Sequence, residues 1–503
     1  MRMSDFRELV DLAGEKLGGS VLYANDDFFA EKENLIKPGK PVWKEHEYTD
    51  RGKWMDGWES RRRRTAGHDF AILRLGARGV VRGVVVDTSF FRGNFPESCS
   101  IEGVSLSPLA SVDELLEAKW LPIHGHSKLQ GDSENIFAVG STFAVTHLRF
   151  NIFPDGGVAR LRVHGEPVPD WHRAGGLEGE VDLAAVENGG EVLACSDAFF
   201  GPKNNLIMPG RALNMSDGWE TRRRRGPGHD WVVVKLTTEG VVHRVEVDTN
   251  HFKGNFPDTS SIDGSTDLEN WVDVLPRTKL QAHTRHLFVD ELHGRGPFTH
   301  LRLNVFPDGG VSRLRVWGKA TEEGRHAAVV RYVNTLAEPE RDLQSCCGSS
   351  KWVDAVAQAR PFEDWKELTA AADRIWSDLG SDDQMEAFRA HPRIGERVIP
   401  SAAALRPDSS PSSRLGMTRG WTADEQSGTR TASSDTMNAL AKGNREYEEK
   451  FGHIYLVCAT GRSADDMLAN LRERMKNDPA SESRAAAEEQ RKITTLRLEK
   501  LVL

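Results

Sequence analysis

One long polar pattern occurs twice in this chain and constrains its fold more than any other feature. The copies are Asp56-Gly-Trp-Glu-Ser-Arg-Arg-Arg-Arg-Thr-Ala-Gly-His-Asp69 and Asp217-Gly-Trp-Glu-Thr-Arg-Arg-Arg-Arg-Gly-Pro-Gly-His-Asp230. Each copy is followed by Gly-Asn-Phe-Pro and, further on, by Thr-His-Leu-Arg and Phe-Pro-Asp-Gly-Gly-Val. Repetition over such a length indicates a tandem duplication and predicts two similar domains in succession.

Each repeat is predicted to be an all-β jelly roll or sandwich. Apolar and polar side chains alternate over residues 245–248, 301–305 and 313–316, and this period of two is typical of half-buried antiparallel strands. Pro154-Asp-Gly-Gly and its counterpart at Pro307 lie between two such strands and indicate tight turns. Short strands joined by such turns favour a β-sandwich.

From about Arg331 onward the spacing of apolar residues becomes helical. Ser381-Asp-Asp-Gln384 and Ser463-Ala-Asp-Asp466 have the form of helix N-terminal caps, and the tail from Ser481 to Leu503 is rich in Ala, Glu and Arg. We therefore expect a multidomain chain in which two all-β jelly-roll repeats precede an all-α domain. The boundaries are placed at residues 1–170, 171–330 and 331–503.

Three further segments are predicted from local patterns. Residues 4–16 are expected to form an amphipathic helix that Ser4 caps and Gly18-Gly19 ends, because the apolar residues share one face. Residues 166–190 have the Pro, Gly and acidic bias of a linker between the repeats. Alternation over residues 454–457 favours a strand.

Composition excludes several classes of protein. The net charge of −9 argues against a general nucleic-acid binder. The arginine runs at residues 61–64 and 222–225 are therefore expected to have a local role. The five cysteines have no regular spacing, and no cluster near Cys346-Cys347 has zinc spacing, so a reducing compartment is expected. No apolar signal core or membrane-spanning run is found. We expect a cytoplasmic protein without a membrane partner.

The duplicated polar cluster is the first candidate site. Several neighbouring arginines suit a small anion, because a guanidinium pairs with carboxylate or ureido oxygens in two-point geometry. The histidine before the closing Asp could act as a general base or help to bind a metal, or it could form only a structural hydrogen bond. Retention of the cluster in both copies favours a shared polar role, catalytic or architectural. The candidates are Glu59, Arg63, His68 and Asn94, with Glu220, Arg224, His229 and Asn255.

Three places stand out in the helical part. His391-Pro392 lies at a helix end, where the helix dipole favours a protonated imidazole. Thr422 and Glu425-Gln426 follow a loop rich in Gly and Ser, and Arg497 lies in the last helix. Each place also has a structural explanation. Thr422 with Glu425 fits a capping box, a His before Pro often only ends a helix, and an Arg can simply lie at the surface.

Residues 1 to about 330 resemble allantoicase, which hydrolyses allantoate to ureidoglycolate and urea. The resemblance rests on the repeated motifs above and on Lys32-Glu-Asn-Leu-Ile, and it implies two jelly rolls related to galactose-binding-like domains. The copies differ, since repeat 1 has an insertion over residues 41–54 and Ser89-Phe90 where repeat 2 has Asn250-His251. The two repeats are therefore expected to be unequal in catalysis. Which one is active, and whether a metal is needed, stays open.

Residues from about 331 to 503 resemble 2-oxo-4-hydroxy-4-carboxy-5-ureidoimidazoline (OHCU) decarboxylase. The matching pieces include Cys346-Cys-Gly-Ser-Ser-Lys-Trp, Arg360-Pro-Phe, His391-Pro and Val457-Cys-Ala-Thr-Gly. The resemblance implies an all-helical enzyme without a cofactor that releases CO2 to form (S)-allantoin, with residues 454–457 helical. It also implies site roles for individual residues. These are catalysis for His391, Glu425 and Arg497, and substrate contacts for Thr422, Gln426 and Pro392.

The two resemblances together predict a bifunctional enzyme of purine catabolism that acts on small ureides. The two reactions are not consecutive, because allantoin must be opened to allantoate between them, so channelling between the sites is not implied. The alternative is a tandem ligand-binding β-sandwich module that carries a decarboxylase domain. A binding module would vary its polar cluster between copies, whereas this chain retains it. A homo-oligomer is expected, because both families usually assemble.

Overall fold

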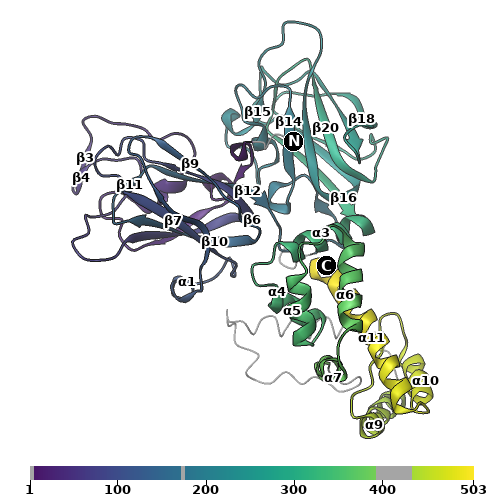
Figure 1. Ribbon diagram of the computed structural model, residues 1–503. Helices are drawn as coiled ribbons and strands as arrows, with labels where there is room; N and C mark the ends of the chain where they lie inside the picture. The colour runs from purple at the N-terminus through teal and green to yellow at the C-terminus, as the bar shows by residue number, and fades with distance from the viewer. Residues whose placement is uncertain (1–4, 172–175, 392–432) are drawn as a thin grey trace. The chain divides into compact units, whose positions relative to one another are not determined.

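The computed structural model describes residues 5–171, 176–391 and 433–503. The chain divides into two compact units, Met1–Ala337 with Val502–Leu503 and Glu338–Leu501. The first unit contains two β-sandwiches, drawn from purple to teal in Figure 1, and the second is built from helices. This confirms the predicted fold class of tandem all-β jelly rolls followed by an all-α domain.

A long central strand organises repeat 1. This strand, β6 (Asp69–Asp87), pairs through its first part with β2 and β10, and through its second part with β12 and β9. Gly76 lies between the two parts, where a Cβ atom would stand 2.6 Å from the carbonyl oxygen of Leu17. The other elements of the repeat are β1 (Val10–Asp11), β2 (Ser20–Ala24), η3 (Lys32–Ile36), β7 (Ser98–Val104), α1 (Val112–Glu117), β8 (Leu121–Lys128), β9 (Glu134–Ala138), β10 (Ala144–Phe153) and β12 (Arg160–Pro167).

Repeat 2 has the same topology around β16 (Asp230–Asp248). The strand order β13-β22-β16-β20-β17-β18 corresponds to β1-β12-β6-β10-β7-β8 of repeat 1, with β14 and β19 also paired to β16. The alternation predicted over residues 245–248, 301–305 and 313–316 lies on β16, β20 and β22. The elements are β13 (Val181–Asp182), β14 (Glu191–Cys195), η5 (Lys203–Ile207), η6 (Met215–Asp217), β17 (Thr259–Ser265), β18 (Val272–Lys279), β19 (Arg285–Phe288), β20 (Phe298–Phe306) and β22 (Arg313–Ala320).

The duplicated Asp-Gly-Trp-Glu motif forms a short strand in each repeat. In repeat 1, β5 (Trp58–Glu59) pairs with β11 (Gly157–Val158), and in repeat 2, β15 (Trp219–Glu220) pairs with β21 (Gly310–Val311). Both tryptophans are fully buried, and their indole N–H groups donate to carbonyl oxygens at 2.8 Å. The motif is therefore anchored by its Trp, while the Glu beside it stays only partly buried. The insertion of repeat 1 adds the hairpin β3 (Tyr48–Thr49) and β4 (Gly52–Lys53).

The predicted helix over residues 4–16 is wrong. The described part of this segment forms η1 (Phe6–Glu8), the strand β1 and η2 (Glu15–Leu17). The reason is tertiary, because β1 pairs with β12 and the Leu12 amide donates to the Val163 carbonyl at 2.7 Å. Those sheet hydrogen bonds outweigh a weak helical propensity.

The predicted linker over residues 166–190 is also wrong in its second half. Val181-Asp-Leu-Ala repeats Val10-Asp-Leu-Ala, and it forms the strand β13, followed by η4 (Val186–Asn188). Leu183, like Leu12, is fully buried. Repeat 2 thus begins before Glu191, and the recurrence of this tetrapeptide was the signal in the sequence.

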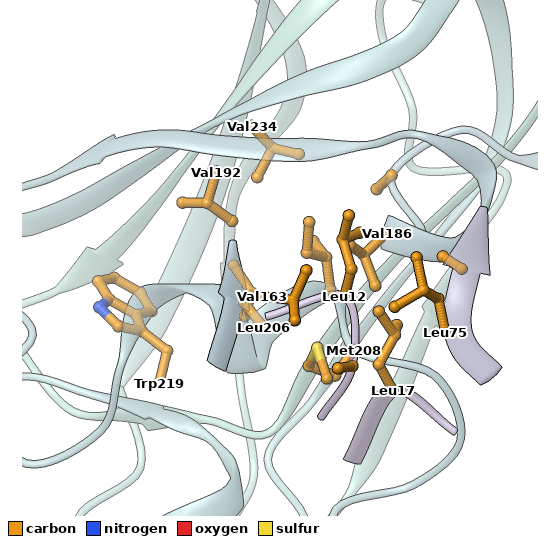
Figure 2. Packing of buried hydrophobic residues seen from close by; sticks show 14 of the residues in the cluster. Leu12, Leu17, Leu75, Val163, Val186, Val192, Leu206, Met208, Trp219 and Val234 are labelled. Atoms are coloured by element: carbon orange, nitrogen blue, oxygen red, sulfur yellow. The ribbon is translucent and has the colours of Figure 1, made fainter. Parts of the chain in front are cut away.

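The two repeats share one hydrophobic core. Figure 2 shows Leu12, Leu17 and Leu75 of repeat 1 in one cluster with Val186 and Met208 of repeat 2. Two ion pairs flank the cluster. Lys16 pairs with Asp217 at 2.9 Å, and Lys203 pairs with Glu8 at 3.0 Å. The segment before β2 therefore has a packing role at the junction, which explains why its apolar residues resemble those of an amphipathic helix.

Helices form the second unit. Ser463 caps α10 and forms a capping box with Asp466, as predicted, whereas α7 begins one residue earlier than predicted because Gly380 is its N-cap. α3 (Glu322–Asn334) follows repeat 2 and belongs to the first unit. The remaining helices are α4 (Pro339–Cys346), α5 (Ser350–Gln358), α6 (Trp365–Ser377), α7 (Ser381–Arg389), α9 (Ser434–Phe451), α10 (Ala464–Arg474), α11 (Pro479–Glu499) and η9 (Lys500–Val502).

Residues 454–457 are neither strand nor helix, so both expectations for them are wrong. The segment is buried, and charged side chains take the place of a strand partner. The Arg474 guanidinium donates to the Leu456 carbonyl, and the Cys458 amide donates to the Glu489 carboxylate at 2.7 Å. Because these side chains satisfy its main chain, the segment needs no regular secondary structure.

Candidate active sites

The loops at one end of repeat 1 bring Glu59 and Asn94 together. The Asn94 amide donates to Glu59 Oε1 at 2.7 Å, and the Asn94 carbonyl accepts from the Gly157 amide at 2.7 Å. The Gly-Asn-Phe-Pro loop and the Phe-Pro-Asp-Gly-Gly turn therefore meet at the Asp-Gly-Trp-Glu motif. Burial raises the pKa of the Glu59 carboxyl, and the hydrogen bond from Asn94 opposes this. Repeat 2 contains the same pair, Asn255 with Glu220.

Arg63 and His68 lie in an adjacent network. The Arg63 guanidinium pairs with the buried Asp69 carboxylate and donates to the His68 carbonyl at 3.1 Å. Its main-chain amide donates to Asp155 at 2.8 Å. The His68 ring lies 3.2 Å from the Asn151 side-chain oxygen. The Arg63 guanidinium is therefore already paired with a carboxylate of the protein, Asp69.

Repeat 2 reproduces these contacts. Arg224 pairs with Asp230, its amide donates to Asp308 at 2.8 Å, and His229 lies 3.2 Å from the Asn304 side-chain oxygen. The predicted residues thus come together in the same two groups in both copies, a Glu–Asn pair and an Arg–His network. The Phe-Pro-Asp-Gly-Gly turn contacts both groups.

Sequence reasoning missed the partners of the two histidines. Asn151 donates to Glu102 at 3.1 Å, and Asn304 donates to Asp263 at 2.9 Å. The signal was present, because the repeated Thr-His-Leu-Arg motif extends two residues further to each Asn, and Ser-Ile-Glu-Gly recurs as Ser-Ile-Asp-Gly. A polar network of His, Asn and a carboxylate therefore crosses neighbouring strands in each repeat.

The repeats differ beside the Gly-Asn-Phe-Pro loops. In repeat 1 the Phe90 amide donates to Asp132 at 2.8 Å, and Trp43 of the insertion lies 5.7 Å from the Phe90 ring. In repeat 2 the His251 amide donates to the ring of His283 at 2.8 Å. The insertion thus places an aromatic side chain over a position where repeat 2 has a pair of imidazoles. The two sites are chemically unequal, as the sequence differences indicated.

In the helical unit His391 is neutral, so the expectation of a protonated imidazole is wrong. Burial and the neighbouring positive charge of Arg497 lower the pKa of His391 to about 3. These effects outweigh the helix dipole. His391 Nε2 lies 2.7 Å from Gln490 Oε1, while Gln490 Nε2 donates to Thr494 at 3.1 Å. Because Oε1 can only accept, Nε2 of His391 carries the proton and Nδ1 has a lone pair.

Arg497 is buried rather than lying at the surface. It is 4% exposed, and its guanidinium lies 3.4 Å from the Ser345 carbonyl, which it can reach as a donor. Gln490, Thr494 and Arg497 follow each other at helical spacing on α11, and all three are buried. Sequence reasoning missed this polar stripe, because the apolar spacing of the tail predicts a helix but does not show which of its polar residues are buried.

Cys347 lies beside this stripe but has no thiolate character. Burial raises the pKa of the Cys347 thiol to about 11, and burial raises the pKa of Cys346 as well. Both thiols therefore stay protonated near neutral pH, which argues against a nucleophilic role. The predicted residues Pro392, Thr422, Glu425 and Gln426 lie outside the described residues.

Over residues 5–171, 176–391 and 433–503, no group of His, Cys, Asp and Glu side chains is arranged to hold a metal ion. No helix among the described residues is long and apolar enough to cross a membrane.

The family model for the allantoicase repeat matches residues 10–168 and 181–321, which is more than half of the chain. The chain belongs to the allantoicase family. Among curated relatives, the probable allantoicase of Pseudomonas fluorescens strain Pf0-1 is 50% identical over 328 residues, covering 63% of this chain and 98% of that protein. The probable allantoicase of Photobacterium profundum is 50% identical over 329 residues, with the same coverage.

A solved allantoicase structure agrees with this assignment. The crystal structure of allantoicase from Saccharomyces cerevisiae covers 62% of this chain and 93% of its own, at 35% identity and a TM-score of 0.54. The family model for OHCU decarboxylase matches residues 335–499. A crystal structure of OHCU decarboxylase in the presence of (S)-allantoin covers 32% of this chain and 97% of its own, at 35% identity and a TM-score of 0.26. The chain is a bifunctional enzyme of purine catabolism, with a hydrolase and a decarboxylase part.

Proposed function

We propose that residues 1–330 hydrolyse allantoate to ureidoglycolate and urea, and that residues 331–503 decarboxylate OHCU to (S)-allantoin. The observation that carries the proposal is the match of two enzyme families to consecutive parts of one chain. The paired polar networks in both repeats and the neutral His391 beside Arg497 support it.

We assign the hydrolase chemistry to the loop end of the repeats. The Glu–Asn pairs at Glu59–Asn94 and Glu220–Asn255 can accept and donate hydrogen bonds to a ureido group. The raised pKa of Glu59 suits a carboxyl that exchanges a proton during catalysis. Arg63 and Arg224, with His68 and His229, position these loops through their contacts with the buried carboxylates and the Asn side chains.

We assign the decarboxylase chemistry to His391 and Arg497, with Glu425, Gln426, Thr422 and Pro392 as further substrate contacts. Loss of CO2 leaves negative charge on the ring carbon, which an enzyme without a cofactor must stabilise with fixed donors before a proton is delivered. Arg497 offers a permanent charge to the anionic substrate. The Nδ1 lone pair of His391 can accept a hydrogen bond from a substrate hydroxyl, because Gln490 holds the ring in that tautomer.

The full chain tests both activities at once. Urea release from allantoate is measured beside (S)-allantoin formation, which is followed by circular dichroism. Glu59→Gln and Glu220→Gln are expected to lower only urea release, and at least one of them by about tenfold or more. His391→Asn is expected to lower only (S)-allantoin formation. A wild-type chain without urea release, or normal release in both Glu variants, would overturn the respective assignment.

We also propose that the protein works in the cytoplasm as a homo-oligomer. All five cysteines are free, which fits a reducing compartment. Exposed apolar side chains at Phe199, Phe200 and Leu213 offer area for subunit contact. Light scattering at micromolar concentration is expected to give a multiple of the chain mass, and a single-chain mass would contradict the assembly.

A further inference from the structure

The junction between the repeats can form only once in each chain. Lys16 of repeat 1 pairs there with Asp217 of repeat 2. At the equivalent positions the chain has Glu187 and Asp56, which would repel each other. The junction is thus heterologous, with different surfaces of the two repeats in contact. Any site built at this junction is unique, although almost every other feature of the unit is duplicated.

A cavity of about 420 Å³ lies at this junction. This volume falls within the usual range for small-molecule sites. Its walls come from the middle of β6, the connection between the repeats and η4 of repeat 2. They include Arg74, Gly76, Pro169, Asp170, Glu187 and Asn188.

Two opposite charges face this cavity without pairing. The Arg74 side chain is half-buried, yet it makes no hydrogen bond or ion pair with any residue that the structure describes. Glu187 is exposed at the edge of the cavity, and it has no ion pair within the described part of the chain. The equivalent of Glu187 in repeat 1 is Lys16, which is paired with Asp217. A half-buried guanidinium without a partner is unfavourable, and a ligand anion would relieve that cost.

We propose that this cavity binds a small carboxylate that carries ureido or amide N–H groups. Arg74 pairs with the ligand carboxylate through two parallel hydrogen bonds. Glu187 accepts hydrogen bonds from the ligand N–H groups, because an ionised carboxylate is an acceptor only. The inference rests on the proposed hydrolysis of allantoate, since allantoate is a carboxylate with two ureido groups and belongs to this ligand class.

Binding of N-carbamoylglycine, a simple ureido carboxylate, to the full chain tests the proposal by isothermal titration calorimetry. Arg74→Gln and Glu187→Gln are each expected to raise the Kd by about tenfold or more, because each removes a charged partner. The duplication supplies matched controls. Lys235→Gln changes the exposed position of repeat 2 that corresponds to Arg74, and Glu15→Gln changes an exposed carboxylate on η2. Both controls are expected to stay within about twofold of wild type.

The outcomes separate this proposal from the proposed function. If N-carbamoylglycine does not bind, or binds equally to wild type, Arg74→Gln and Glu187→Gln, the cavity is not a ureido-carboxylate site. Allantoate turnover by the same samples decides the proposed function independently. Allantoate turnover without N-carbamoylglycine binding at the cavity contradicts only the inference. Binding without turnover contradicts only the hydrolase assignment. Weakened binding in the two cavity variants with unchanged controls supports the inference.

Discussion

At the scale of the residue, His391 shows how surroundings decide chemistry. Its place at the end of α7 favours a charged ring, yet burial and the neighbouring Arg497 keep the ring neutral. The hydrogen bond to Gln490 then selects the tautomer. A neutral imidazole offers a lone pair to the substrate, whereas an imidazolium does not, but the lowered pKa makes that lone pair a weak base. The expected role of His391 therefore changes from a cation to a hydrogen-bond acceptor.

The lowered pKa of His391 predicts how stability depends on pH. The unfolded chain has a His pKa of about 6.5, so it binds a proton before the folded chain does as the pH falls. The contribution of His391 to stability is therefore present above that pH and is lost as the pH falls towards 3. Chemical denaturation at pH 7 and pH 5 is expected to show a larger loss for wild type than for His391→Asn. Equal losses would show that His391 is not held neutral.

The same variant tests the catalytic role of the residue. His391→Asn is expected to lower the rate of (S)-allantoin formation by about two to three orders of magnitude at pH 7, the usual cost of removing one preorganised group. A thermal melt run beside the assay should show a folded protein. Normal turnover would remove His391 from the mechanism.

At the scale of the element, α11 organises the helical unit. Its polar side chains contact four different parts of the chain. Glu482 accepts from Arg474 Nε at 2.8 Å and from the Tyr447 hydroxyl, Glu489 accepts from the Cys458 amide, and Gln490 contacts His391. The helix thus holds both the irregular segment over residues 454–457 and the candidate decarboxylase site. Apolar periodicity predicts the helix but not this function.

Removing one member of the buried pair should destabilise the unit strongly. Arg474 and Glu482 have side-chain exposures of 8% and 0%, so Arg474→Met leaves a buried carboxylate without its charge partner. We expect a loss of about 3–5 kcal/mol in the free energy of unfolding, measured with urea. Arg491→Met is the control, because Arg491 pairs with Asp373 at half-exposed positions and should cost about 1 kcal/mol or less. Similar losses in both variants would contradict the structural role of the network.

At the scale of the whole molecule, the first unit consists of two similar repeats joined by a contact that is not repeated from one molecule to the next. Met208 and Leu17 contribute to the shared core, whereas their equivalents Lys37 and Asn188 are not part of it. Lys37 is exposed. A heterologous contact that could repeat would produce open chains of molecules. The polar residues on the unused surfaces therefore limit the junction to one per chain.

The sequence by itself determined the duplication, the strands of both repeats, the change to helices and both enzyme families. These depend on local periodicity and on motifs, which any reader of the chain can see. Only the tertiary structure showed that Val10-Asp11 is a strand, because its hydrogen bonds run to residues about 150 positions away, where sheet pairing overrides helical propensity. Only the tertiary structure placed Asn151 and Gln490 beside the predicted histidines. Burial and the charge of a distant Arg497 set the protonation of His391, and neither can be read from its neighbours in the chain.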